Sequence, residues 1–253
     1  MLPLRESGKL EMVAVETSGG PLLVPYEIRR SPRGRRIRLS LGPQNQALLK
    51  VPAHGSVRDA LGFLRSQGDW LEKQLKKAPP PMALAEHLKK HPRLSGLGRE
   101  FAVTLNFTSA RPFFVSSEKS GEVEFRYPVE EGGEAALGGL LRQFAENVLS
   151  PRVRELAGRR GLRVKRVSVR NQGTRWGSCA ASGTVSLNWR LVLLPVELHD
   201  YVLWHELAHL REMNHAESFW NLLRSYDASA DGHDRELTRV SRTLMRLGRA
   251  GSL

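Results

Sequence analysis

The stretch YVLWHELAHLREMNHAESFW, Tyr201 to Trp220, places three histidines and a glutamate at a spacing that suits a metal ion. An α-helix turns about 100° per residue, so His205 and His209 lie on one face, about one turn apart. The opposite face of such a helix is apolar and carries Leu203, Leu207 and Leu210. The pattern therefore predicts a helix that binds a metal ion with one face and packs with the other.

The motif His-Glu-x-x-His supplies two ligands of a catalytic metal, and Glu206 lies where it can reach a water molecule on that metal. Catalytic zinc usually takes three protein ligands and leaves its fourth position open. We expect His215 to be the third ligand, because a helix end at Asn214 would turn the chain back toward the first two histidines. Other third ligands stay open at this point: Glu212, Glu217, His233 and Glu236.

A zinc ion lowers the pKa of its bound water toward neutrality, and Glu206 would take up the proton and pass it to the leaving group. These residues predict a zinc-dependent hydrolase with one zinc ion per chain. The alternative is a helix whose histidines only fill a polar surface, but such a helix needs no acid between them. Residues that could stabilise an oxyanion or contact the substrate are Arg175, Asn188, Arg190, Tyr201 and His233.

The composition is that of a globular protein: 253 residues, 40% of them hydrophobic, enough for one large domain or two. A net charge of +13 favours a nucleotide, nucleic acid or acidic partner, although a solvated surface without a partner can carry it too. Cys179 is the single cysteine, which excludes an intrachain disulfide and suits a reducing compartment. No apolar run reaches the length of a signal peptide or a membrane span, so we expect a cytoplasmic protein without a membrane partner.

Hydrophobic periodicity divides the first half of the chain into strands and helices. Arg36 to Leu41 alternates apolar and polar residues, as a half-buried strand does. Val57 to Lys77 has a helical repeat that Gly68 interrupts. The acidic, glycine-rich segment Val129 to Gly139 is the best boundary, so we predict an N-terminal β-rich domain over residues 1–130 and a catalytic domain over residues 135–253. Further predicted elements are a helix at Met82 to Lys90 and strands at Glu100 to Phe107, Pro112 to Val115 and Glu122 to Tyr127.

The pattern of the second half predicts a catalytic domain built around the metal helix. Leu140 to Arg160 is helical in pattern, and Pro151 is expected to kink or split it. Asn171 to Pro195 contains two strand-like runs separated by glycines, which predicts a hairpin beside the metal helix. Pro195 is expected to stand at the start of that helix. Cys179 is interpreted as a small residue packed under Trp176, and the aromatic residues that we expect to hold the site are Trp204, Phe219 and Trp220. Other predicted elements are a strand at Val164 to Val169 and helices at Ala216 to Tyr226 and His233 to Arg249.

Four motifs in this order resemble the YgjP-like metallopeptidase family, which is related to the SprT-like metalloproteases. They are RWGSC (Arg175 to Cys179), LNWRL (Leu187 to Leu191), P-x5-YVLWHELAHL and NHAESFW. The resemblance is strongest from Val167 to Trp220 and covers most of the chain more loosely. It implies an α+β fold with a zincin-like catalytic domain, a metal helix packed on a small sheet, and an N-terminal β-rich domain.

By the same resemblance His205, His209 and His215 are the zinc ligands, and Glu206 is the catalytic acid and base. Gly173 departs from the family pattern, since relatives often have a lysine there, which removes a basic side chain from that position. The spacing of the histidines also equals that of metzincins. Glu212 stands where metzincins have a turn-forming glycine, so the chain is not assigned to them.

Three functions compete at this stage. The leading hypothesis is a metallopeptidase whose extended peptide or protein substrate lies along an edge strand near Ser186 to Arg190. A metal-dependent nucleotide phosphohydrolase could use the same site, because a metal-activated hydroxide also attacks phosphoryl groups. The third is a nucleic-acid-associated protein or protease, recruited through its basic surface.

Overall fold

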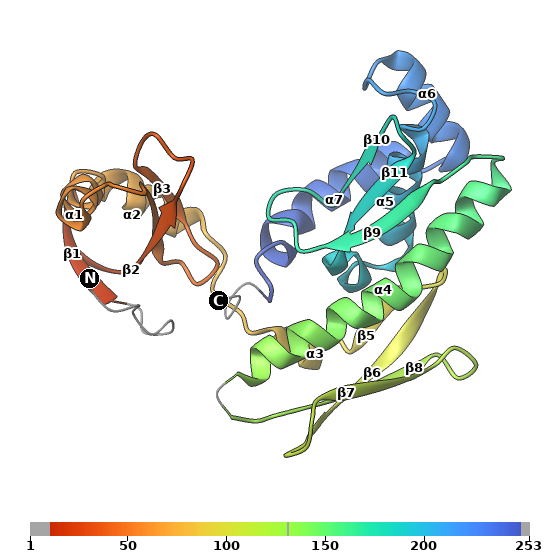
Figure 1. Cartoon of the computed structure of the whole chain (residues 1–253), viewed down its shortest axis with the longest axis horizontal. Coiled ribbons are helices and arrows are strands. Elements are labelled where there is room, and N and C mark those ends of the chain that lie inside the picture. Colours follow the sequence, from red (N-terminus) through yellow and green to blue (C-terminus); the bar gives the residue numbers. More distant parts are fainter. Residues whose placement is uncertain (1–10, 131, 249–253) are drawn as a thin grey trace. The chain divides into compact units, whose positions relative to one another are not determined.

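The computed structural model describes residues 11–130 and 132–248, which form two compact units divided between Met82 and Ala83 (Figure 1). This division differs from the boundary predicted in Val129 to Gly139, between residues 1–130 and 135–253. The physical reason is that helix α4 begins at Gly133 and packs against the strands that precede it, so these strands share a core with the catalytic segment.

The first unit is a four-stranded sheet covered by two short helices. Its core consists of aliphatic side chains from both layers, among them Val15, Val24, Leu49 and Leu64. A β-carbon at Gly68 would lie 1.8 Å from the carbonyl oxygen of Glu16, so glycine is needed where the second helix meets the sheet. The sheet order is β1-β2-β4-β3, and the elements are β1 (Glu11–Thr17), β2 (Gly20–Ser31), β3 (Arg38–Leu41), β4 (Ala47–Pro52), α1 (Val57–Arg65) and α2 (Gly68–Lys77).

The second unit starts with a short helix and a second four-stranded sheet that packs on a long helix. Phe101 and Phe125 of the sheet contact Phe144 of that helix, with ring centroids 5.3 and 6.1 Å apart. Of the two effects expected of Pro151, a kink or a split, the split does not occur, because α4 runs through Pro151, which is exposed. The sheet order is β5-β6-β8-β7, and the elements are α3 (Leu84–Lys90), β5 (Arg93–Gly96), β6 (Arg99–Phe107), β7 (Phe113–Ser117), β8 (Glu122–Tyr127) and α4 (Gly133–Arg159).

A three-stranded sheet and three helices complete this unit on the other side of α4 (Figure 1). The sheet order is β10-β11-β9, in which β11 pairs with β10 antiparallel and with β9 parallel. The elements are β9 (Arg166–Arg170), β10 (Gly177–Ala180), β11 (Thr184–Asn188), the 3-10 helix η1 (Trp189–Leu193), α5 (Val196–Ala208), α6 (Glu217–Tyr226) and α7 (Ala230–Leu244).

The strand at Ser186 is therefore not an edge strand, which corrects the predicted substrate position near Ser186 to Arg190. β11 has a partner on both sides, and Arg190 lies in η1, where a fully buried apolar run forms a 3-10 helix instead of a strand. The free edges of this sheet are β9 and β10.

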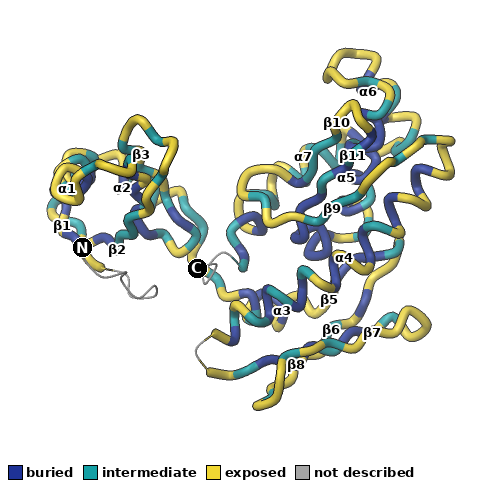
Figure 2. The backbone as a smooth tube through the Cα atoms, viewed as in Figure 1, coloured by how far each residue is buried: buried dark blue, intermediate teal, exposed yellow. Residues whose placement is uncertain are grey.

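α5 is the most buried of these helices, dark along most of its length in Figure 2. A buried ion pair anchors it to α4: Arg152 donates to Asp200, with Nε 3.1 Å from Oδ1, and Asp200 also contacts Nδ1 of His199 at 3.0 Å. A helix fixed at this depth can hold side chains at defined positions. No helix among the described residues has both the length and the apolarity to cross a membrane.

Candidate active site

The metal helix ends earlier than predicted. α5 stops at Ala208, His209 is its cap residue, and the chain turns through hydrogen bonds from Leu210 to Leu207 and from Arg211 to Ala208. Asn214, the predicted helix end, does not adopt the left-handed conformation with which such a residue turns a chain back. The turn right after His209 lets the chain double back, so His215 reaches the first pair of histidines without any positive φ.

The structure brings His205, His209 and His215 together. Their ligand atoms all lie within 4.8 Å of one another, and Nε2 of His205 is 3.1 Å from Nε2 of His215. Tetrahedral zinc, with Zn–N bonds of about 2.1 Å, would hold two nitrogens about 3.4 Å apart, so the donor set fits zinc. Among the described residues no other group of three potential ligands gathers in this way.

His205 and His209 are in the neutral state that a metal requires. His209 contacts the carbonyl oxygen of Glu212 through Nδ1 at 3.0 Å, so Nδ1 carries the hydrogen and Nε2 keeps its lone pair. Burial, with the neighbouring His209 and His215, lowers the pKa of His205 to about 4. Burial also lowers the pKa of His209. Both rings are therefore neutral at pH 7.

Phe219 holds all three rings in place. This fully buried side chain of α6 has its ring centroid 4.6 Å from that of His209, 4.7 Å from His215 and 4.9 Å from His205. Trp220 lies 6.1 Å from His215 and Trp204 packs against Tyr226 at 5.3 Å. These contacts confirm the expectation that Phe219 and Trp220 support the site, whereas Trp204 packs α5 against α6.

Glu206 lies buried against β10. Its side chain is enclosed, and a β-carbon at Gly177 would lie 2.5 Å from Oε1, so glycine in the motif RWGSC makes room for the carboxylate. Oε2 has no hydrogen-bond partner among the described residues. Burial raises the pKa of Glu206 to about 8, and the charge of Arg175 acts in the opposite direction. A raised pKa means a higher affinity for a proton, which suits a group that takes up a proton and later returns it.

Arg175 is the one predicted substrate contact that the structure leaves exposed beside Glu206. The side-chain amide of Asn188 donates to the carbonyl oxygens of Arg175 and Gln172, at 3.0 and 2.9 Å. Asn188 and Arg190 are fully buried, and Nε of Arg190 donates to the carbonyl oxygen of Leu247 at 2.7 Å. These two side chains therefore brace the scaffold and have no surface to offer a substrate, which corrects their predicted role.

Tyr201 packs against the ring of His205. It is buried, its hydroxyl donates to Asp234 at 2.9 Å, and its ring meets that of His205 edge-on at 6.2 Å. Burial and the carboxylate of Asp234 raise the pKa of Tyr201. His233 lies 5.9 Å from the Tyr201 ring and contacts Asp227 through Nδ1 at 2.6 Å. The structure thus places both residues in a network that orients the site.

The alternative third ligands have other partners. Glu212 accepts a hydrogen bond from Ser218 at 2.9 Å, and Glu236 accepts one from Arg239 at 2.8 Å. Glu217 lies 3.7 Å from Arg224. Sequence reasoning missed Gly177, Asp227 and Asp234 as parts of this site, because the contacts that give them a role join elements distant in the chain.

Comparison with known proteins adds an independent observation. The chain is similar to a solved structure described as the metallopeptidase zymogen of Pyrococcus abyssi abylysin, with 26% identity over 36% of this chain and 92% of that chain, at a TM-score of 0.32. No curated protein matches. The model of the family described as YgjP-like, metallopeptidase domain, matches residues 35–240. Since this match spans most of the chain and contains every residue of the histidine cluster, the protein is a hydrolase that belongs to the YgjP-like metallopeptidase family.

Proposed function

We propose that the chain is a zinc-dependent peptidase, with His205, His209 and His215 as the ligands of one zinc ion and Glu206 as the catalytic acid and base. The observation that carries this proposal is the pairing of three clustered imidazoles with a buried carboxylate whose Oε2 has no partner among the described residues. A bound zinc ion supplies a Lewis acid and a more acidic water. Glu206 takes the proton of the attacking water and returns it to the leaving amine.

Arg175 is proposed to stabilise the oxyanion of the substrate. Its exposed guanidinium is the positive charge that acts on Glu206, and a cation near the general base can offset the negative charge that develops during attack on a carbonyl. The hydrogen bond from Asn188 to its main-chain carbonyl fixes the segment that carries it. We propose that Tyr201, whose hydroxyl donates a hydrogen bond to Asp234, orients His205.

The outer edge of β10 is proposed to bind the substrate main chain. In an antiparallel pair, residues that exchange hydrogen bonds alternate with residues that exchange none. Asn188 donates to the carbonyl oxygen of Trp176 at 2.7 Å, so in this register Ser178 and Ala180 also bond to β11. The N–H and C=O groups of Gly177 and Cys179 therefore point outward, next to Glu206, where an extended peptide can pair with them.

The test is digestion of a mixed peptide library by the zinc-loaded full chain and by the Glu206→Gln variant. We expect the wild type to cleave and the variant to lose cleavage while it retains zinc. Equal cleavage by both proteins would refute the role of Glu206. Release of phosphate from nucleotides by the wild type alone, without peptide cleavage, would instead assign the site to the phosphohydrolase alternative.

A further inference from the structure

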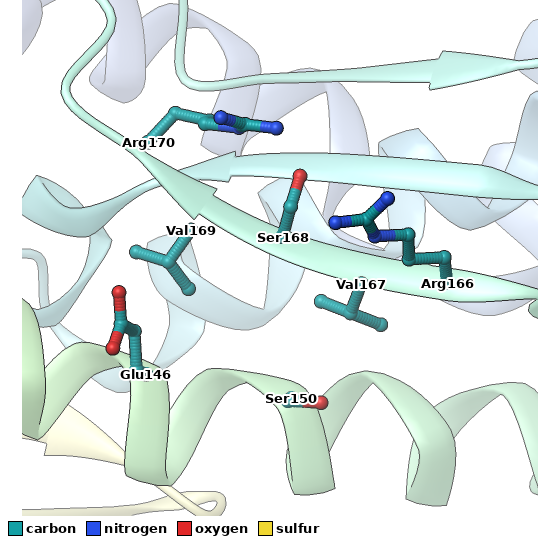
Figure 3. A pocket seen from close by; sticks show the side chains of 7 residues that line it. All are labelled: Glu146, Ser150, Arg166, Val167, Ser168, Val169 and Arg170. Carbon is teal, nitrogen blue, oxygen red and sulfur yellow. The ribbon is translucent and has the colours of Figure 1, made fainter.

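A groove lies at the edge of the sheet opposite to β10. It has a volume of about 330 Å³, runs between β9 and α4, and is lined by Glu146, Ser150 and residues 166–170. Figure 3 shows Val167 and Val169 pointing from β9 toward α4, with Arg166, Ser168 and Arg170 on the other face of the strand. Because β11 separates β9 from β10, this groove is not part of the histidine site.

The main chain of β9 is open to this groove. Arg166 donates to the carbonyl oxygen of Gly183 at 3.3 Å, and alternate residues of a parallel strand bond to the same neighbour. Arg166, Ser168 and Arg170 therefore bond to β11, and the N–H and C=O groups of Val167 and Val169 point outward. Such an edge is a template for another extended strand.

The charges around this edge select the kind of strand that can pair with it. Arg166 and Arg170 are exposed on one face, and Arg163 and Lys165, just before the strand, are exposed too. None of these four cations forms an ion pair within the described chain. A second copy of β9 paired antiparallel would place like charges opposite one another, which destabilises a sheet. Acidic side chains at alternate positions would instead meet Arg166 and Arg170.

We propose that the outer edge of β9 docks an extended, acidic segment of a partner protein, which adds to the sheet as a fourth strand. Its acidic residues would lie beside Arg166 and Arg170, and its intervening apolar residues would face α4 next to Val167 and Val169. Glu146, which points from α4 toward Val169 in Figure 3, favours an uncharged residue at that end of the groove. A nucleic acid would use the arginines but not the valines or the main-chain groups.

The test uses the full chain with Glu206→Gln, so that the probe is not cleaved. The probe is a fluorescent peptide of about six residues, a usual strand length, in which glutamate alternates with valine. We expect saturable binding by anisotropy and slower hydrogen exchange at the amides of Val167 and Val169. A peptide of the same composition, with its glutamates and valines in separate blocks, should bind more weakly.

Two matched sets of variants separate docking from general attraction. Arg166→Glu with Arg170→Glu should weaken binding about tenfold or more, whereas Arg163→Glu with Lys165→Glu makes the same charge change outside the groove and should weaken it less. Val167→Pro removes one outward N–H without touching the bonds to β11 and should weaken binding about fivefold. Far-UV circular dichroism checks that each variant is folded.

Several outcomes would overturn the proposal. Equal losses in the two charge-reversal pairs would show diffuse attraction rather than a site. Protection at Gly177 and Cys179 instead of β9 would show that the peptide binds as a substrate. Tighter binding of an oligothymidylate through the same arginines would assign this edge to nucleic acid. Because the probe is read by binding alone, these results do not depend on peptidase activity.

Discussion

The two free edges of the three-stranded sheet differ in what lies against them. At β10, Gly177 makes room for the carboxylate of Glu206, and Arg175 brings a positive charge to the same place. At β9, two valines face α4 and two arginines stand on the opposite face, with no histidine cluster beside them. The comparison teaches that an open strand edge by itself offers only main-chain hydrogen bonds. The side chains next to the edge determine whether it serves catalysis or the binding of a partner.

The largest expected difference between the edges comes from Glu206→Gln. Removing the general base should lower kcat for peptide cleavage by about 10³-fold or more, because proton transfer is lost while the amide keeps the shape of the side chain. Binding of the acidic peptide at β9 should not change. The measurement is steady-state cleavage of a fluorogenic peptide together with zinc content. Glu197→Gln, an exposed glutamate of the same helix, is the matched control and should stay within about twofold of wild type.

A methyl group at Gly177 should have the next largest effect. Gly177→Ala would push its β-carbon into Oε1 of Glu206 and displace the carboxylate, which should lower kcat/KM about 10²-fold. The zinc content should be retained, since the atoms nearest to the new methyl group belong to Glu206 and not to a histidine. Ser178→Ala, on the other face of the same strand, serves as the control and should be nearly silent. Unchanged activity in Gly177→Ala would mean that Glu206 is not held against β10.

A proline on each outer edge sharpens the comparison further. Cys179→Pro removes an outward N–H of β10 and should raise KM about fivefold, with kcat less affected, because one hydrogen bond to the substrate main chain is lost. Val167→Pro makes the equivalent change at β9 and should leave peptide cleavage unaltered. Michaelis–Menten analysis of both variants measures this. If the two prolines raised KM alike, the substrate would not be bound at β10 alone.

Acid is expected to affect the two edges alike, because it lowers the stability of the scaffold that they share. Burial and the neighbouring His91 lower the pKa of His87 in α3 to about 4. The unfolded chain binds this proton near pH 6.5, so stability is full above that pH and is lost as the pH falls toward 4, by about 3 kcal/mol. Urea unfolding between pH 7 and 4 measures the loss. His87→Leu should make the pH dependence shallower, while His205, whose pKa is also lowered to about 4, keeps its own share. An equally steep dependence in this variant would exclude His87 as a source.

Local features of this fold could be predicted from the sequence. The metal helix, the break between α1 and α2 near Gly68 and the return of His215 toward the first pair all follow from short-range spacing. The start of α4 could not, because its glycines resemble a linker. Buried Leu137, Leu140 and Leu141 override that weak propensity through packing.

Long-range pairing was the part that the sequence could not reveal. The run WRLVL has the composition of a buried strand, yet it forms η1, and periodicity does not separate a buried strand from a buried helical segment. The position of β11 between β9 and β10 depends on partners distant in the chain. For the same reason, the contact of Gly177 with Glu206 became apparent only in three dimensions.

The ligand set of the metal is the central claim, and X-ray absorption at the zinc edge of the loaded full chain tests it most directly. We predict one zinc ion per chain, coordinated by three imidazoles at about 2.0–2.1 Å. His215→Ala should reduce the coordination to two imidazoles. A spectrum with two imidazoles and a carboxylate in the wild type, unchanged in His215→Ala, would contradict the account and assign the third position to a glutamate.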